Sequence, residues 1–294
     1  MTGLGAATQK ITDVPELPEA ETIARQLRAE VLGARIVGVS VQRPMSVRPH
    51  STRAFRALVR GRTVTDVGRR GKCPLLRLGA DCWLIVRLGM SGRLLVGNGP
   101  TRRPPHTRVA LRFRDGRELR FVDPRAFGWL SLECAGEADS LSQLSRLGPE
   151  PLSRHWTPEM LSKALAGRRA GIERVLMEGR AVAGIGKIYA DEACFRARIH
   201  PETPAGSLTS RQIERLHQAI KDVLSEAIKH CGTSAADRAY VDFYGSTGSF
   251  QNFLHVYQRA GKPCRVCGAR IRRVPLGRAR GIHFCPRCQR PRKK

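Results

Sequence analysis

Four cysteines near the C-terminus have the spacing of a metal site. Cys264 and Cys267 form one C-x-x-C pair, and Cys285 and Cys288 form a second pair after 17 intervening residues. Each pair presents two thiolates to one tetrahedral ion, and the span between them is long enough for a β-hairpin. A redox role fits less well, because redox motifs normally use a single C-x-x-C. The spacing predicts one structural zinc ion per chain, since four thiolates leave no open position on the metal.

The segment around these cysteines is strongly basic. Residues 259–294 contain 13 Lys and Arg and no Asp or Glu. A disordered basic tail is one interpretation of such a run. The cysteines favour a zinc-pinned hairpin instead, which folds a segment that has no core of its own. Such a hairpin suits contact with DNA, while RNA and protein binding remain alternatives.

The whole chain carries the same charge bias. Its 294 residues include 52 Lys and Arg against 25 Asp and Glu, a formal charge of +27. This charge indicates a polyanionic partner, with nucleic acid first and the ribosome or anionic lipid as weaker alternatives. An Arg-rich composition can also reflect a GC-rich genome. A hydrophobic content of 41% excludes wholesale disorder. A length of 294 residues suits about two domains.

Two kinds of targeting segment are not expected. No run approaches the roughly 18 apolar residues of a membrane-spanning helix. The first residues, MTGLGAATQKITDV, lack the apolar core of a signal peptide. We therefore expect a protein that is neither secreted nor membrane-embedded.

The remaining five cysteines stand in apolar or small-residue contexts and are expected to be ordinary buried thiols: Cys73, Cys82, Cys134, Cys194 and Cys231.

The first part of the chain predicts one helix followed by many strands. Pro18 and Gly33 suit the start and the stop of a helix over 18–32. Asp115-Gly116 between two alternating runs is a strong hairpin signal. Many short strands without intervening helices indicate a sandwich or barrel. The expected strands are 35–42, 62–68, 74–78, 82–88, 108–114, 117–122 and 128–132, and a loop is expected over 97–107.

From about residue 145 the apolar period becomes helical. Helices are expected over 158–166, 171–178, 187–196 and 209–230. Between the second and third lies AVAGIGKIY, a glycine-rich turn that runs into a helix N-terminus. Backbone N–H groups at such an end suit a phosphate, although this pattern alone is weak.

Several further motifs occur in order along the chain. They are PELPEAET (15–22), RRGK (69–72), LGMSGRL (88–94), PHT (105–107), DPRAFG (123–128), LGPEPL (147–152), AGIGKIYADEACFRARIHP (183–201) and the four-cysteine finger. Together these motifs resemble the formamidopyrimidine-DNA glycosylase/endonuclease VIII family, and the resemblance extends from Pro15 to about Gln289. The PELPE form is similar to the formamidopyrimidine branch.

The resemblance implies a multidomain α+β protein that acts on duplex DNA with an oxidised base or abasic site. The implied activity is a DNA N-glycosylase and apurinic/apyrimidinic lyase that removes 8-oxoguanine and formamidopyrimidines after flipping the base out. We expect a monomer in the bacterial cytoplasm, associated with the nucleoid. The implied parts are an extension over 1–14, a catalytic β-sandwich over 15–134, a helix–two-turn–helix domain over 145–242 and a zinc finger over 253–290.

The family's catalytic residues match four positions here. Pro15 matches the nucleophile, a free N-terminal secondary amine that forms an iminium with the sugar. Glu16 matches the acid that assists base loss and ring opening. Lys72 matches a cleft lysine that contacts phosphate and supports elimination. Arg280 matches the finger arginine that contacts phosphate and assists the last elimination. Without the resemblance, Glu16 and Lys72 are ordinary surface residues.

Five further positions match the family's DNA contacts. Met90, Arg125 and Phe127 match the wedge that fills the hole left by the flipped base. Two apolar groups can replace stacking, and a guanidinium can face the orphaned base. His106 and Arg168 match contacts to the DNA backbone. Taken singly, Met90 and Phe127 are more often core residues, and the other two more often plain surface residues.

The chain departs from the family pattern at four places. Pro15 is preceded by 14 residues, Lys187 stands for the usual Asn, Glu173 for the usual Lys, and Ala126 for an arginine. We expect Lys187 to face a phosphate from its helix N-terminus. Glu173 is expected to pair with Lys187 and so to weaken that contact.

An internal proline nitrogen is a tertiary amide and cannot act as a nucleophile. Val14 directly precedes Pro15, and a GTG codon is read as Val internally but as Met at a bacterial start. We expect the working protein to begin at Pro15. Two alternatives remain: a catalytically silent relative that binds damaged or abasic DNA, and a zinc-ribbon protein that binds RNA.

Overall fold

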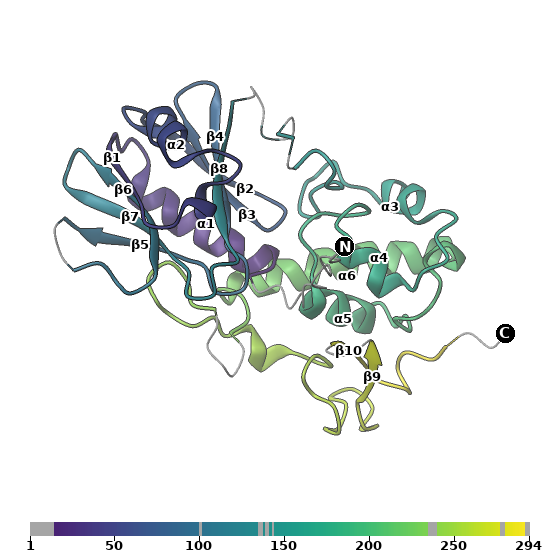
Figure 1. Ribbon diagram of the computed structural model, residues 1–294. Helices are drawn as coiled ribbons and strands as arrows, with labels where there is room; N and C mark the ends of the chain where they lie inside the picture. Colours follow the sequence, from purple (N-terminus) through teal and green to yellow (C-terminus); the bar gives the residue numbers. More distant parts are fainter. Residues whose placement is uncertain are drawn as a thin grey trace, which may run out of the picture.

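The computed structural model describes residues 15–99, 102–134, 138, 141–142, 144–234, 240–276 and 280–291, with the side chains of Leu276 and Arg280 outside this described part. Figure 1 shows a β-sandwich lobe, a helical lobe beside it, and a small C-terminal hairpin next to the helical lobe. We call residues 253–291 the finger. None of the described helices combines the length and the apolarity needed to cross a bilayer.

Helix α1 (Leu17–Val31) connects the two lobes. Pro18 lies in its first turn, as expected, and Gly33 follows its end with a positive φ of 79°. Leu17 belongs to the core of the helical lobe, whereas Ile23 and Leu27 belong to the core of the sandwich. A single helix therefore places the residues just before it between both lobes.

The sandwich consists of two antiparallel four-stranded sheets. Their orders are β1-β6-β7-β5 and β2-β3-β4-β8. Apolar side chains alternate toward the space between the sheets and form one core. The strands are β1 (Ile36–Val41), β2 (Val64–Arg70), β3 (Cys73–Leu78), β4 (Cys82–Arg87), β5 (Arg93–Asn98), β6 (Thr107–Phe113), β7 (Arg117–Val122) and β8 (Trp129–Cys134).

The Asp115-Gly116 hairpin is confirmed, and it joins β6 to β7 with Gly116 at φ 88°.

Two elements differ from expectation. Helix α2 (Thr52–Val59) interrupts a region expected to hold strands only. Strand β5 is absent from the expected strands, and it pairs with β7 and reaches into the expected loop as far as Asn98. The Arg120 guanidinium occupies the space beside Gly97 of β5, where an added Cβ would lie 2.6 Å from it.

The four expected helices of the second lobe are confirmed within about one residue at each end. They are α3 (Pro158–Leu165), α4 (Ile172–Met177), α5 (Lys187–Arg196) and α6 (Ser210–Lys229). Thr157 caps α3 by accepting the N–H of Met160. These helices pack around one apolar core that includes Leu216, Ile220 and Leu224 of α6.

The finger contains one antiparallel hairpin, β9 (Arg272–Leu276) with β10 (Arg280–Phe284). Its small core combines Ile271, Val256 and the cysteines with Phe195 of α5. The expected hairpin between the two C-x-x-C pairs is therefore present.

The expectation of five separate thiols is wrong for two of them. Cys82 and Cys134 form a disulfide. Antiparallel pairing of β4 with β8 places them directly opposite each other, although they are 52 residues apart in the sequence. Cys73 and Cys194 are buried free thiols, as expected, and Cys231 is half-buried.

Candidate functional site

The carboxylate of Glu16 is held at the N-terminus of α5. It accepts hydrogen bonds from the backbone N–H groups of Gly186 at 2.8 Å and Ile188 at 3.0 Å, with Tyr189 at 3.4 Å. The glycine-rich turn was expected to offer these N–H groups to a phosphate. In the structure they hold a side chain of the same protein, because α1 brings Glu16 directly onto the helix end.

The glycines of this turn are required by that close approach. A Cβ added to Gly186 would lie 2.3 Å from the Glu16 carboxyl carbon. A Cβ on Gly184 would lie 2.7 Å from Leu17, and the φ of Gly184 is 79°. Any larger residue at either position would push Glu16 and Pro15 away from α5.

Glu16 combines burial with a nearby cation. Its side chain is 1% exposed, and burial raises its pKa to about 7, against the opposing effect of the Lys72 ammonium. A carboxyl group with this pKa is partly protonated near neutral pH and can act as a general acid. Pro15 is also buried, directly before Glu16, while residues 1–14 lie outside the described residues.

A second buried carboxylate fixes the backbone of Glu16. Glu19 accepts hydrogen bonds from the Glu16 N–H at 2.9 Å, the Tyr189 hydroxyl at 2.5 Å and the Thr233 N–H at 2.7 Å. Burial raises the pKa of Glu19, against the effect of the Tyr189 hydrogen bond. The sequence analysis did not single out Glu19, whose role depends on residues about 170 and 214 positions away.

Lys72 lies in the β2–β3 turn, which the helical lobe holds through Glu150. The Glu150 carboxylate accepts the Gly71 N–H at 2.7 Å and pairs with Arg70 at 3.0 Å and Arg69 at 2.7 Å. Gly71 has a φ of 58°, which suits only glycine at low cost. The turn that carries Lys72 is therefore fixed from both lobes.

The predicted wedge residues come from two adjoining loops of the sandwich. Met90 is half-buried, Phe127 is 41% exposed, and the Arg125 guanidinium lies 5.0 Å from the Phe127 ring centroid. The structure therefore brings the three predicted wedge residues to one place.

A buried aspartate that the sequence analysis missed ties these loops together. Asp123 is fully buried, and it accepts hydrogen bonds from the Ser91 hydroxyl at 2.5 Å and the Gly128 N–H at 2.7 Å. Its own N–H donates to the carbonyl of His106 at 3.0 Å. Through its carboxylate and its backbone N–H, Asp123 thereby links the loops of Met90, Phe127 and His106.

The two predicted backbone contacts are both accessible. His106 is exposed and has a φ of 63°, and Arg168 lies between α3 and α4. The Arg168 guanidinium pairs with Glu178 and is 34% exposed. Arg280 begins β10, but its side chain lies outside the described residues.

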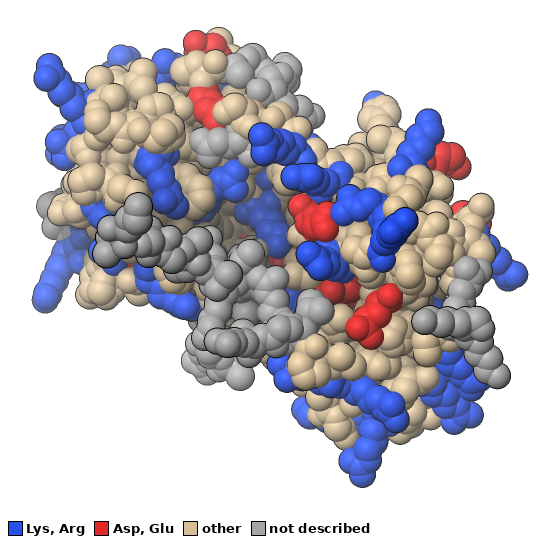
Figure 2. Space-filling model, turned by 45° about the vertical axis from the view of Figure 1, so that its right-hand side comes forward, with Lys and Arg blue, Asp and Glu red and all other residues tan. Residues whose placement is uncertain are grey.

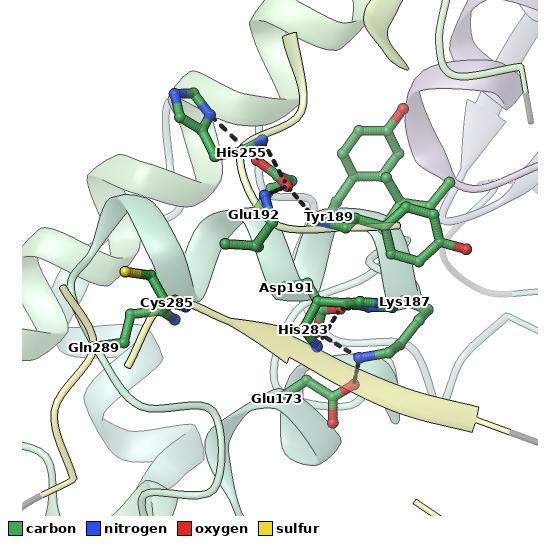
Figure 3. Close-up of polar contacts among 12 residues, drawn as sticks. Glu173, Lys187, Tyr189, Asp191, Glu192, His255, His283, Cys285 and Gln289 are labelled. Carbon is green, nitrogen blue, oxygen red and sulfur yellow. Dashed lines mark hydrogen bonds and ion pairs between the residues drawn. The ribbon is translucent and has the colours of Figure 1, made fainter. Parts of the chain in front are cut away.

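Lys187 lies within an internal network of charges, as Figure 3 shows. Its ammonium donates to Glu173 at 2.8 Å and to Asp191 at 2.5 Å, and it is only 13% exposed. The expected pairing with Glu173 is therefore present. The other Asp191 oxygen accepts the N–H of His283 at 3.1 Å and lies 3.0 Å from its Nδ1. This network links α4 and α5 to β10 of the finger.

We expect Lys187→Met to destabilise the helical lobe by about 3–5 kcal/mol, because it removes one partner of a buried ion pair. Glu173 and Asp191 are 1% and 0% exposed, so their charges need this cation. Denaturant unfolding measures the effect, and Lys163→Met on the exposed face of α3 is the matched control.

The double variant Lys187→Asn with Glu173→Lys moves the cation across the same network. We expect it to restore most of the lost stability and to tighten binding to abasic duplex, because a positive charge replaces Glu173. Unchanged or weaker binding in a filter or anisotropy assay contradicts the second expectation.

The four finger cysteines form a cluster that could hold a metal ion. Their Sγ atoms all lie within 4.8 Å of one another, with Cys264 and Cys288 4.0 Å apart and Cys267 and Cys285 3.4 Å apart. The N–H groups of Val266 and Cys288 point at two of these sulfurs at 3.4 Å. Such N–H groups stabilise thiolates, which are the metal-binding form of cysteine.

Two more buried residues that the sequence analysis missed attach the finger to α5. Glu192 accepts the N–H groups of His255, Val256 and Tyr257 at 2.9, 2.8 and 2.9 Å. Burial opposes its charge, but hydrogen bonds from His255 and from these N–H groups hold its pKa below the ordinary value. Gln289 accepts the Cys285 N–H and donates to the Ile199 carbonyl, both at 2.9 Å.

Basic side chains surround this region. Figure 2 shows Lys and Arg on both walls of the hollow between the sandwich lobe and the helical lobe. Glu16 directly precedes the helix that connects the two lobes, and Glu150 of the helical lobe holds the turn that carries Lys72. A basic hollow with a buried, partly protonated carboxyl beside it suits chemistry on a polyanion.

Two family models match the chain. The formamidopyrimidine-DNA glycosylase N-terminal domain matches residues 14–130, and the H2TH domain of the same family matches residues 147–238. The chain is 45% identical to a formamidopyrimidine-DNA glycosylase of Symbiobacterium thermophilum over 94% of this chain and 89% of that protein. It is 42% identical to one of Brevibacillus brevis over 94% and 99%.

Solved structures agree with these matches. The MutM (Fpg) protein of Thermus thermophilus superposes with a TM-score of 0.83 at 40% identity, covering 94% of this chain and 98% of that one. The Lactococcus lactis Fpg in complex with DNA that contains an abasic site gives 0.86 at 32% identity, covering 94% and 100%. A MutM complex with carbocyclic 8-oxo-G DNA gives 0.85 at 33% identity with the same coverage.

Proposed function

Because this chain belongs to the formamidopyrimidine-DNA glycosylase family and is a DNA glycosylase that repairs oxidised purines, we propose that its chemistry takes place on the amine of Pro15 with Glu16 as the acid. The observation that carries this proposal is the position of Glu16. Its buried carboxyl is adjacent to Pro15, is fastened to α5, and has a pKa of about 7.

The proposed steps start from a free, neutral Pro15 nitrogen. Its lone pair attacks C1′ of the damaged nucleotide, and the bond from C1′ to the base breaks with its electron pair going to the base. The C1′–O4′ bond then opens to an iminium, and the proton that the Pro15 nitrogen loses passes by way of Glu16 to the sugar oxygen. Glu16 is the group placed to deliver protons to the leaving base or to O4′.

The iminium then activates the sugar for strand cleavage. It draws electrons from the adjacent C2′–H bond, so that loss of this proton expels the 3′ phosphate. Lys72 and Arg280 supply positive charge for the phosphates that leave. The pairs that fasten the Lys72 turn to Glu150 support such a role, because the turn cannot retreat from the cleft.

We infer the DNA interface from the same residues. The relatives crystallised with abasic-site and 8-oxo-G DNA support a damaged duplex as the ligand of this chain as well. Met90, Arg125 and Phe127 are proposed to fill the gap left by the flipped base, and His106 and Arg168 to contact phosphates. The curated relatives are bacterial proteins, which supports action on chromosomal DNA in a bacterial cytoplasm.

Zinc fits the four-cysteine site. Tetrahedral zinc with Zn–S bonds of about 2.3 Å needs sulfurs about 3.8 Å apart, and the two measured separations are 4.0 and 3.4 Å. We propose that Cys264, Cys267, Cys285 and Cys288 hold one structural zinc ion. When bound, the ion stabilises the fold of the finger and takes no part in the reaction.

We expect Glu16→Gln to reduce excision of 8-oxoguanine by roughly 10²–10⁴-fold, the usual contribution of a general acid. The amide can still accept the N–H groups of α5 but has no proton to give. The loss should be smaller on abasic duplex, where the base has already left. Single-turnover cleavage of both duplexes measures this difference, and equal losses would show that Glu16 acts in another way.

The pH dependence follows from two groups. Excision needs protonated Glu16, with its pKa of about 7, and a neutral Pro15 amine, which titrates near ~7.7–8.0. We therefore expect a bell-shaped rate profile with its maximum between those two values, and loss of the alkaline limb in Glu16→Gln.

The same pKa affects stability with a definite sign. Because the folded pKa of Glu16 lies above its ordinary value of 4.5, the folded state binds the proton more tightly. Its contribution to stability is present at low pH and is lost as the pH rises through about 7.

Met90→Ala should impair base flipping but leave binding to undamaged duplex unchanged. Met90 contributes an apolar side chain and no charge, so it adds nothing to the phosphate contacts that dominate nonspecific binding. Fluorescence of a 2-aminopurine opposite the lesion reports flipping. Equal affinity losses on intact and damaged duplex would contradict this division.

A further inference from the structure

An arginine-lined hollow lies on the sandwich, away from the site described above. It has a volume of about 370 Å³ and is lined by Val37–Ser40 of β1, Ala110 and Arg112 of β6, Glu118 of β7, Arg56 of α2, Arg60 directly after α2, and Arg103. We call this set the arginine hollow. Figure 1 shows α2 and β1 on the side of the sandwich remote from α3, α4 and the finger.

The strand register explains the floor of the hollow. Gly38 lies opposite Arg112, and Ser40 lies opposite Ala110. These positions alternate with core residues such as Val109 and Leu111, so they face outward. Small residues leave the floor open, and a Cβ on Gly38 would lie 3.2 Å from the Arg112 guanidinium.

Helix α2 contributes the rim. Phe55 and Val59 are buried beneath it, whereas Arg56 on its last turn and Arg60, the residue that directly follows it, are both exposed. Two exposed positive charges so close together repel each other. A bound anion between them would reverse that effect.

The one carboxylate of the hollow is already neutralised. Glu118 accepts hydrogen bonds from Arg103 at 2.7 and 3.0 Å and from Arg120 at 3.1 Å. These contacts, with one from Arg103 to the Ser40 hydroxyl at 3.0 Å, hold Arg103 in place. Within the described part of the chain, Arg56, Arg60 and Arg112 form no ion pair with a carboxylate.

We propose that the arginine hollow binds a multiply charged phosphate group outside the DNA cleft. Guanidinium groups recognise phosphate oxygens through paired N–H donors, and three of them converge here on an open floor of small residues. The phosphate can come from a free oligophosphate or from the backbone of a second DNA segment. The two sources share this chemistry, and experiment separates them.

The test uses the full protein with its cleft filled by uncleavable abasic-analogue duplex. Tripolyphosphate is titrated into this complex by calorimetry at low salt. We expect one bound tripolyphosphate per parent protein. The double variant Arg56→Gln with Arg112→Gln should lose roughly tenfold in affinity for tripolyphosphate for each arginine removed. The matched control is Arg53→Gln with Arg114→Gln, which removes two exposed arginines from α2 and from the end of β6.

A second arm presents a labelled undamaged duplex to the same complex held on beads. Capture of that duplex, lost in Arg56→Gln with Arg112→Gln but kept in the control pair, identifies DNA as the source. Tripolyphosphate binding without capture identifies a free oligophosphate. The proposal is overturned if tripolyphosphate and duplex both fail to bind, or if the control pair loses as much affinity.

Excision of 8-oxoguanine should be unchanged in both double variants, because none of these arginines belongs to the proposed site. This readout separates the two proposals. A failure of the arginine hollow leaves excision intact, whereas a failure of the proposed chemistry appears in excision and leaves tripolyphosphate binding intact.

Discussion

A protein that begins at Pro15 should form a covalent adduct with abasic or 8-oxoguanine duplex in the presence of borohydride, and the 294-residue chain should not. The iminium formed by a secondary amine is reducible at C1′, and the added hydride makes the link permanent. In the longer chain the Pro15 nitrogen belongs to a peptide bond, so its lone pair is delocalised and unreactive.

The acid–base properties of the amine favour this reaction near neutral pH. An α-amine titrates near ~7.7–8.0, so roughly a quarter is neutral at about pH 7.4, against ~0.1% for an ordinary lysine. The buried position of Pro15 beside Glu16 places this nitrogen where the acid can assist it.

The measurement is the gel shift of the trapped complex together with the intact mass of each protein. A Pro15-start protein that retains one extra N-terminal residue is the matched control, because it differs only in the amide. Trapping by an untrimmed 294-residue chain would assign the nucleophile to another amine. If neither protein traps DNA, the silent-binder alternative replaces the proposed chemistry. The N-terminal residue of the protein from its native host tests the proposed start.

Disruption of the cysteine cluster should abolish strand cleavage. The core of the finger consists of a few apolar residues and the cysteines themselves, so without a metal the hairpin depends on its polar contacts with α5. Structural zinc sites contribute about 10–16 kcal/mol to folding in small fingers. Cys267→Ala or chelation should therefore unfold β9 and β10 and withdraw Arg280 from the DNA.

Metal analysis, strand cleavage and hydrogen exchange of the finger amides measure this together. We expect one zinc per chain in the parent protein and none in Cys267→Ala. Cys231→Ala is the matched control, because Cys231 is a free, half-buried thiol outside the cluster. An active protein without zinc would falsify the proposed role of the metal.

The sequence by itself predicted the features that depend on neighbours along the chain. The C-x-x-C pairs, the Asp115-Gly116 hairpin and the four helices of the second lobe all follow from local spacing, and all are present. Local prediction failed for α2 and β5. Helix α2 lies inside a strand-rich region, and its local signal is the cap at Ser51, whose hydroxyl accepts the N–H of Ala54. Strand β5 ends in Gly97-Asn98, which is typical of a loop unless β7 lies beside it.

Only the tertiary structure decided how these elements make a site. Three contacts join residues that are far apart in the sequence. Glu16 accepts the N–H of Gly186 across 170 positions, and Glu150 accepts the N–H of Gly71 across 79 positions. The Cys82–Cys134 disulfide spans 52 positions. Asp123, Asp191 and Glu192 were not predicted, because a carboxylate in a sequence carries no sign that it will be buried. Burial forces such a group to find N–H partners or a cation, and which partners it finds depends on the packing of distant segments.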